Sequence, residues 1–167
     1  MTATNVLSHG WGRGAITMLV LAALIPMVSG CGIGVRTRAL VGEQVLVDVH
    51  VSESANDNSP VAVDLLLIHD EERLKSLLGI SARDWFATRE QIHRDNPDDP
   101  GFEVWSWEWV PGQTVPELQL PLKPDAIGGV LFANYFSPGE HRLRFSAHDD
   151  MEIYLLKNDV QLKPLEN

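Results

Sequence analysis

The chain has 167 residues, of which 23 are acidic and 13 are lysine or arginine, giving a formal net charge of −10 at pH 7. A surface of this sign repels nucleic-acid phosphate and anionic lipid, so neither is an expected partner. The single cysteine, Cys31, excludes a disulfide within the chain.

The segment before Cys31 has the pattern of a secretory signal peptide. Arg13 is its only lysine or arginine, and an apolar run follows from Ala15 to Val28. A charged start and a short apolar region are typical of such a signal. The run is shorter than the roughly 20 apolar residues that cross a bilayer, so an uncleaved membrane anchor is the weaker alternative.

The end of this segment, Val28-Ser29-Gly30-Cys31, resembles the lipobox of a bacterial lipoprotein. The resemblance implies that residues 1–30 are removed and that the thiol of Cys31 carries a covalent lipid, the only added group that we expect. One acyl chain gives marginal membrane binding, whereas two or more make the anchor stable. Gly32 stands where an inner-membrane retention signal has aspartate, which implies the periplasmic face of the outer membrane.

The mature chain divides into a tether and one domain. Loss of residues 1–30 removes one arginine and no acid, which leaves a formal charge of −11. Residues 31–44 contain the cysteine and glycines without a sustained apolar period, which predicts a tether. Residues 45–167 suffice for one domain with one core.

The domain begins with two strands joined by a polar loop. Val45–Val51 places valine at every second position, which predicts a strand with one buried face. Residues 52–60 are rich in Asn, Asp and Ser, which stabilise turns through side-chain hydrogen bonds. Val61–Ile68 is apolar at nearly every position except Asp64, so we expect a strand covered on both faces.

Two short helices are predicted next. Glu71–Leu78 carries leucines at helical spacing, and Gly79 is a plausible stop. Ser81 is a good N-cap for a second helix, with Asp84 three residues further on and Trp85 as an apolar contact. The pair reads as a helical insertion between strands.

A row of three tryptophans, Trp105, Trp107 and Trp109, lies on one side of a strand predicted over 102–110. Such a row could stack sugars, which makes a carbohydrate- or peptidoglycan-binding module the alternative function. It could also face the two helices and close the core, because each ring buries a large area. We favour the packing role.

The remaining strands are short and separated by turns. Prolines at 116 and 121 limit the strand over 118–122 to an edge, and the segment 127–136 reads as a central strand. Further strands are expected over 141–145, 151–155 and 160–162. The chain is therefore predicted to be mainly β, an antiparallel β-sandwich with a short two-helix insertion.

The order of these features resembles a known family. The first motif is the pair Asn56 and Asn58, which precedes Ser59-Pro60-Val61-Ala62-Val63. Trp85-Phe86 comes next, in the helical insertion. The motifs Val110-Pro111-Gly112-Gln113, Leu118-Gln119-Leu120-Pro121-Leu122 and Gly129-Val130-Leu131-Phe132-Ala133-Asn134-Tyr135 continue it. Behind a lipobox, this order is similar to the type VI secretion lipoprotein family TssJ. The lengthened tryptophan segment and the different ending after Tyr135 indicate a divergent member.

The resemblance implies a transthyretin-like sandwich in the type VI secretion membrane complex. It also implies binding to the periplasmic domain of the inner-membrane component TssM, through the loop between the first two strands. Within that loop we predict Glu53, Asn56, Asp57 and Asn58 as the partner-binding residues, because they are too polar for a core and sit on a fixed scaffold.

Two clusters bring acids beside histidines, His69-Asp70-Glu71-Glu72 and His148-Asp149-Asp150. Neighbouring residues on an extended chain point to opposite faces, so neither cluster predicts a metal site. The sequence has no Gly-x-Ser-x-Gly elbow and no phosphate-binding loop. We therefore expect neither an enzyme nor a metal protein.

Overall fold

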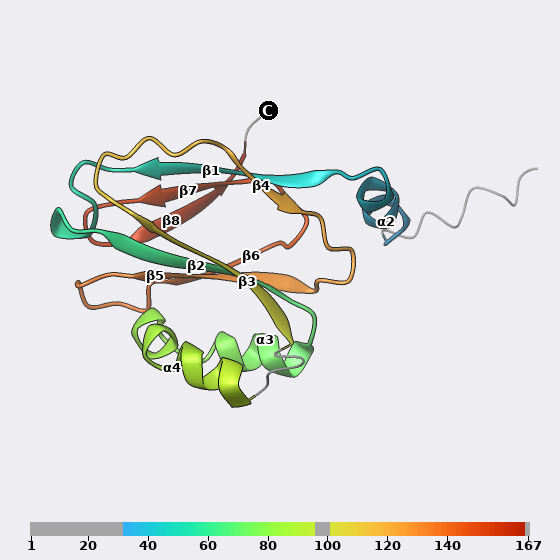
Figure 1. The fold of residues 1–167 in the computed structure, drawn as a ribbon, viewed down its shortest axis with the longest axis horizontal. Coiled ribbons are helices and arrows are strands. Elements are labelled where there is room, and N and C mark those ends of the chain that lie inside the picture. The colour runs from blue at the N-terminus through green and yellow to red at the C-terminus, as the bar shows by residue number, and fades with distance from the viewer. Residues whose placement is uncertain (1–31, 96–100, 166–167) are drawn as a thin grey trace, which may run out of the picture. The chain divides into compact units, whose positions relative to one another are not determined.

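Two four-stranded sheets pack face to face in the computed structural model, which describes residues 32–95 and 101–165 (Figure 1). One sheet has the order β4-β1-β7-β8, and its strands are β4 (Leu118–Pro121), β1 (Gln44–Val51), β7 (Met151–Leu155) and β8 (Val160–Pro164). The other has the order β3-β2-β5-β6, and its strands are β3 (Phe102–Trp109), β2 (Val61–Ile68), β5 (Gly128–Asn134) and β6 (Arg142–Phe145). The expected β-sandwich is confirmed.

One pair of strands departs from the antiparallel prediction, since β1 and β7 are parallel. The chain leaves β6 and crosses to the other sheet at the end where β1 begins. Strand β7 therefore starts beside the start of β1 and runs in the same direction. Val47 is opposite Met151, and Val51 is opposite Leu155.

The inter-sheet core follows from the alternation seen in the sequence. Val45, Val47 and Val49 of β1 are buried there, and Ile153 of β7 joins them. Gly129 on the central strand β5 permits close packing, because a Cβ at this position would collide with the ring of Phe145. Steric exclusion therefore requires glycine at position 129.

The helical insertion covers the outer face of the second sheet. Its helices are α3 (Glu71–Leu77) and α4 (Ala82–Asp95), and they pack on apolar side chains from β2 and β5 (Figure 1). The predicted N-cap is confirmed, since Asp84 N donates to Ser81 Oγ at 3.2 Å and Ser81 Oγ donates to the Asp84 carboxylate at 2.8 Å. Strand β2 is thus covered on both faces, as predicted.

A buried carboxylate fixes α4 to this sheet. Asp64 on β2 is 1% exposed and accepts hydrogen bonds from Trp85 Nε1 at 2.7 Å and Arg89 Nη1 at 2.6 Å. The ring of Trp85 stacks on Phe132 of β5. A buried charge is tolerated only when it is paired, so Asp64 and Arg89 have to be retained together.

The tryptophan row packs, but on the face opposite to the one expected. The pairs Val61↔Trp109, Val63↔Trp107 and Leu65↔Trp105 place the row on the face of β2 that looks into the inter-sheet core. Phe102 and Val104 face the helices instead. Trp109 is buried, whereas Trp105 and Trp107 are partly buried because β3 is an edge strand.

The segment predicted as a tether contains a helix, α2 (Gly32–Leu40). From Gly34 onward it belongs to the same compact unit as the sandwich. Val35 and Ala39, four residues apart, pack against the core. Among the described side chains of this helix, residues 34–40, these two positions make the contact, and two positions are too few to give a sustained apolar period.

Across residues 32–95 and 101–165, no helix is long and apolar enough to cross a membrane. The predicted signal peptide and Cys31 lie outside the described residues, so the lipidation prediction stays a prediction.

Candidate functional site

Four connections meet at one end of the sandwich, which we name the loop end: residues 52–60, 110–113, 135–141 and 156–159. Strand pairing brings them together, because Val61 is opposite Trp109 and Ala62 is opposite Asn134. They lie at the left of Figure 1. The predicted partner-binding loop, 52–60, is one of the four.

The loop 52–60 is held in a single shape by its own backbone and by a neighbouring turn. It contains a short 3-10 helix, η1 (Ala55–Asp57), and three consecutive residues with positive φ, Asn56, Asp57 and Asn58. Asn and Asp adopt this conformation more readily than other side chains. The backbone N–H groups of Asn56 and Asp57 donate to carbonyls of the β7–β8 turn at 3.3 and 3.1 Å.

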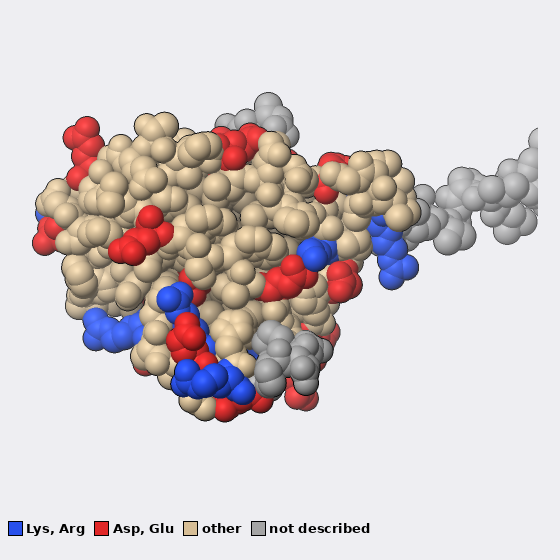
Figure 2. Space-filling view, in the orientation of Figure 1, with Lys and Arg blue, Asp and Glu red and all other residues tan. Residues whose placement is uncertain are grey.

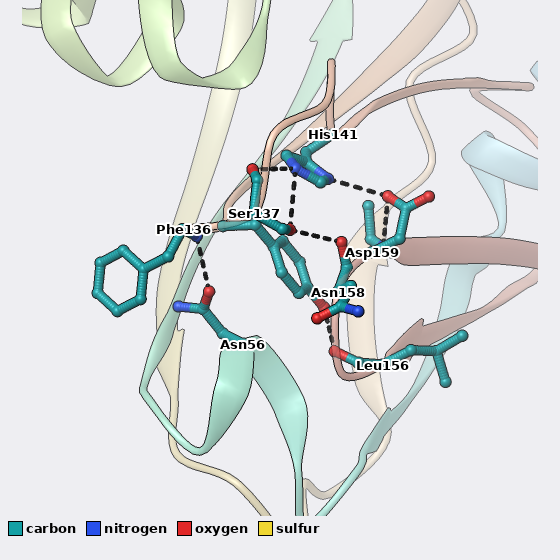
Figure 3. Close-up of polar contacts among 9 residues, drawn as sticks. Asn56, Phe136, Ser137, His141, Leu156, Asn158 and Asp159 are labelled. Carbon is teal, nitrogen blue, oxygen red and sulfur yellow. Dashed lines mark hydrogen bonds and ion pairs between the residues drawn. The ribbon is translucent and has the colours of Figure 1, made fainter.

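Asn56 is inside the structure, which corrects its prediction as a partner-binding residue. It is 2% exposed, its Nδ2 donates to the Pro60 carbonyl at 2.8 Å, and its Oδ1 accepts from Phe136 N at 2.8 Å (Figure 3). Both ends of the amide are therefore used within the chain. Asn56 joins loop 52–60 to the β5–β6 turn.

The other three predicted residues, Glu53, Asp57 and Asn58, are exposed. The Asp57 carboxylate lies 3.6 Å from Lys157 Nζ, and both side chains are largely in solvent. Acidic side chains are spread over the face shown in Figure 2, including the end at the left where loop 52–60 lies. The structure thus brings three of the four predicted residues together on an acidic surface.

A buried histidine joins the β5–β6 and β7–β8 turns at this end, a role that no sequence motif indicated. His141 is 8% exposed, with Nδ1 3.0 Å from Asp159 Oδ1 and Nε2 2.9 Å from the Ser137 carbonyl (Figure 3). Ser137 Oγ donates to the Asn158 carbonyl at 2.6 Å. The β5–β6 and β7–β8 turns are therefore held together by polar contacts between residues 18 to 21 positions apart in sequence.

Ser137, His141 and Asp159 are the residue types of a hydrolase triad, but the hydrogen bonds point the wrong way. Ser137 Oγ lies 3.4 Å from His141 Nε2, but its hydroxyl donates to the nearer Asn158 carbonyl at 2.6 Å. A carbonyl only accepts, so His141 Nε2 carries a proton where it faces the Ser137 carbonyl and cannot take one from the serine. The arrangement is built to hold turns.

Tyr135 completes the hydrogen bonding beneath these turns. Its ring stacks on His141, and its hydroxyl donates to the Leu156 carbonyl at 3.1 Å. Burial, together with the nearby Asp159 carboxylate, raises the pKa of Tyr135 well above its ordinary value. The hydroxyl therefore stays protonated and available as a donor.

An open groove of about 540 Å³ borders the loop end. It lies beside β1 and the segment 112–115, and Ser52 and Leu156 form part of its lining. The ring of His50 stacks on Tyr154 at a centroid distance of 4.5 Å along the same wall. His50 is exposed on the outer strand face.

The acidic clusters have local structural roles. Asp70 caps α3 by accepting from Arg73 N at 2.7 Å, and His69 Nδ1 lies 3.1 Å from Asp125. His148 Nε2 lies 2.9 Å from the Lys123 carbonyl. Within the described part of the chain, no three histidine, cysteine or acidic side chains gather as a metal-binding group.

Comparison with known proteins finds solved structures with a similar architecture. No protein-family model matches the sequence, and no curated protein matches it. The solved structure of the type VI secretion lipoprotein TssJ1 from Pseudomonas aeruginosa has a TM-score of 0.56 and 13% identity, covering 75% of this chain and 98% of the other. The chain has a TssJ fold.

Two further structures agree. Serratia marcescens Lip, a membrane-bound component of the type VI secretion system, has a TM-score of 0.55 and 11% identity, over 75% of this chain and 99% of its own. A chain in the structure of the TssM C-terminal domain from EAEC has a TM-score of 0.54 and 15% identity, over 73% and 98%. The resemblance to TssJ inferred from sequence order is confirmed for the fold.

Proposed function

We propose that this protein is an outer-membrane lipoprotein of a type VI secretion membrane complex. Lipid on Cys31 holds it at the periplasmic face, and its loop end binds the periplasmic domain of a TssM-like inner-membrane protein. It acts as a binding component and not as an enzyme. The observation that carries the proposal is a TssJ fold whose loop 52–60 is fixed by neighbouring turns and presents exposed acceptors.

A fixed loop suits a binding role because binding costs free energy when it orders mobile groups. The hydrogen bonds of Asn56 set the loop before any partner arrives. Glu53 and Asp57 add negative charge to a mature chain of formal charge −11. Such a surface favours a basic partner, through faster association and through rejection of acidic surfaces.

The anchor is tested by Cys31→Ser. Only a thiol accepts the lipid in lipobox chemistry, so the variant should appear as an uncleaved precursor or a soluble protein. Fractionation of cell envelopes and the mobility of the processed form measure this. Normal processing and an unchanged outer-membrane fraction would show that lipidation of Cys31 is not what anchors the chain.

The partner surface is best tested by point substitution. Deleting residues 55–58 would remove Ala55 and Asn56, both buried, and would disturb the fold itself. The double change Glu53→Lys with Asp57→Asn alters only exposed side chains and keeps a residue that tolerates positive φ at position 57. We expect binding of the TssM periplasmic domain to weaken about tenfold or more, or about 1.4 kcal/mol.

The matched control is Glu72→Lys with Glu90→Gln, which makes the same charge change on exposed positions of the helical insertion. It should bind like the parent in the same titration. Equal weakening by both variants would assign the effect to net charge and move the interface away from loop 52–60. Absence of binding by the parent chain would refute the proposed function.

A further inference from the structure

We propose that Phe136 is the apolar anchor of the partner interface, an inference that rests on the proposed function and deepens it. The partner carries an apolar pocket for this ring, surrounded by basic or amide side chains. Phe136 lies in the β5–β6 turn, outside the loop 52–60 through which the family resemblance implies partner binding.

Phe136 is a large apolar side chain that is exposed to solvent. Its side chain is 72% exposed, whereas Tyr135 beside it is 4% exposed and packs against the core. In Figure 3 the ring of Phe136 points away from the hydrogen-bonded cluster formed by the turns. The ring therefore contributes little to folding and is available to another surface.

The backbone that carries Phe136 is fixed on both sides. Its own N–H donates to the buried Asn56 Oδ1 at 2.8 Å. The Tyr135 hydroxyl before it bonds the Leu156 carbonyl, and the Ser137 hydroxyl after it bonds the Asn158 carbonyl. An exposed aromatic ring on a fixed backbone loses only two side-chain torsions on binding, so its burial yields affinity at a small entropic cost.

A second apolar side chain lies at the same end of the sandwich. Val110 is 51% exposed and follows β3, while Phe136 follows β5. Strands β3 and β5 both pair with β2, one on each side. Their ends, which Val110 and Phe136 follow, are therefore about 10 Å apart. One partner surface can therefore cover both residues, with Phe136 as the large central contact typical of a binding hot spot.

The charges around Phe136 favour a different, basic protein as the partner over a second copy of this chain. Glu53, Asp57, Glu140 and Asp159 are exposed acids on the loops of this end, and the exposed base Lys157 already lies against Asp57. A two-fold contact through Phe136 would bring these acids against each other, which is unfavourable. A basic surface with an apolar pocket fits both features.

The test compares Phe136→Ala, Phe136→Leu and Ile127→Ala in the processed lipoprotein, titrated with the TssM periplasmic domain. Ile127 is the matched control, because it is an apolar side chain 43% exposed at the other end of the sandwich. We expect Phe136→Ala to raise Kd about 30-fold, chiefly through faster dissociation, and Phe136→Leu to raise it severalfold. Ile127→Ala should bind like the parent, and all three should melt like the parent.

The outcomes separate this inference from the proposed function. Parent-like binding by Phe136→Ala, while Glu53→Lys with Asp57→Asn is weakened, would overturn the anchor and leave the function standing. A parent that fails to bind would overturn both. If sedimentation shows the parent self-associating and Phe136→Ala monomeric, the ring serves a second copy and the inference is wrong.

Discussion

At the loop end, buried polar side chains hold the turns in place, whereas surface ion pairs predominate at the opposite end, where β1 and β5 begin. Asn56, Tyr135 and His141 are each less than 9% exposed, and each contacts a different turn: Asn56 accepts from Phe136 N, Tyr135 donates to the Leu156 carbonyl, and His141 pairs with the Asp159 carboxylate. Each of these bonds demands one geometry, because an unpaired buried group is costly.

The opposite end includes contacts that solvent can replace. Arg38 lies 2.7 Å from Glu43, and Lys123 lies 2.8 Å from Glu103, with every one of these side chains 32–42% exposed. Exposed ion pairs contribute about 0–1 kcal/mol each and weaken in salt. Buried hydrogen bonds between turns therefore hold the end that carries the proposed interface, whereas exposed ion pairs contribute little at the other end.

The largest expected loss of stability comes from truncating the tryptophan row, and it should be greater at the loop end than toward the opposite end. Trp109 closes the core at the loop end and is 3% exposed, so Trp109→Ala should cost about 3–5 kcal/mol. Trp105 lies further toward the other end and is only partly buried, so its loss should be roughly half as large. Denaturant unfolding of both variants measures the difference, and equal losses would contradict the burial gradient.

Asn56→Ala should have the next largest effect. It leaves the Phe136 N–H and the Pro60 carbonyl without their partner, at about 1–2 kcal/mol each, so we expect a loss of about 2–4 kcal/mol. Asn58→Ala is the matched control, with a similar positive φ of 63° but an exposed side chain. It should cost only about 1 kcal/mol, from the backbone conformation. Similar losses in both would mean that the amide bonds of Asn56 contribute nothing.

Much of this fold follows from local pattern. Alternating valines located β1, continuous apolar residues located β2, and Ser81 with Asp84 located the start of α4. Each of these signals depends on residues close in sequence. The tryptophan row shows where such reasoning ends, because alternation says which side chains share a face and not what lies opposite that face.

The candidate site was only partly predictable for the same reason. A polar residue in a loop is expected to be exposed, yet Asn56 is buried. Its Oδ1 accepts a hydrogen bond from the backbone N–H of Phe136, which is 80 positions away in sequence. The exposure of Phe136 depends on the same long-range bond. The parallel pairing of β1 with β7 likewise depends on the point where the chain crosses between sheets.

Tyr135→Phe tests the buried hydrogen bonding of the loop end through the pH dependence of stability. At neutral pH the change removes one hydrogen bond, to the Leu156 carbonyl, and should cost about 1 kcal/mol. Folding raises the pKa of Tyr135 above 10.0, so the folded chain retains the phenol proton at pH values where the unfolded chain loses it. The stability it contributes is complete below pH 10 and falls as the pH rises further. The gap between parent and variant should therefore narrow above pH 10, and a constant gap would contradict the burial effect.

The smallest expected effect lies at the opposite end, where Lys123 Nζ contacts Glu103 Oε1 at 2.8 Å. Lys123→Met keeps the length of the side chain and removes the charge, so it should cost less than about 1 kcal/mol. High salt screens the pair in the parent, which should bring the parent and variant unfolding curves together. The loss in Asn56→Ala should persist in the same salt, because its bonds are buried and uncharged. A loss at Lys123 as large as that at Asn56, unaffected by salt, would show that both ends are held equally firmly and that rigidity does not distinguish the proposed interface.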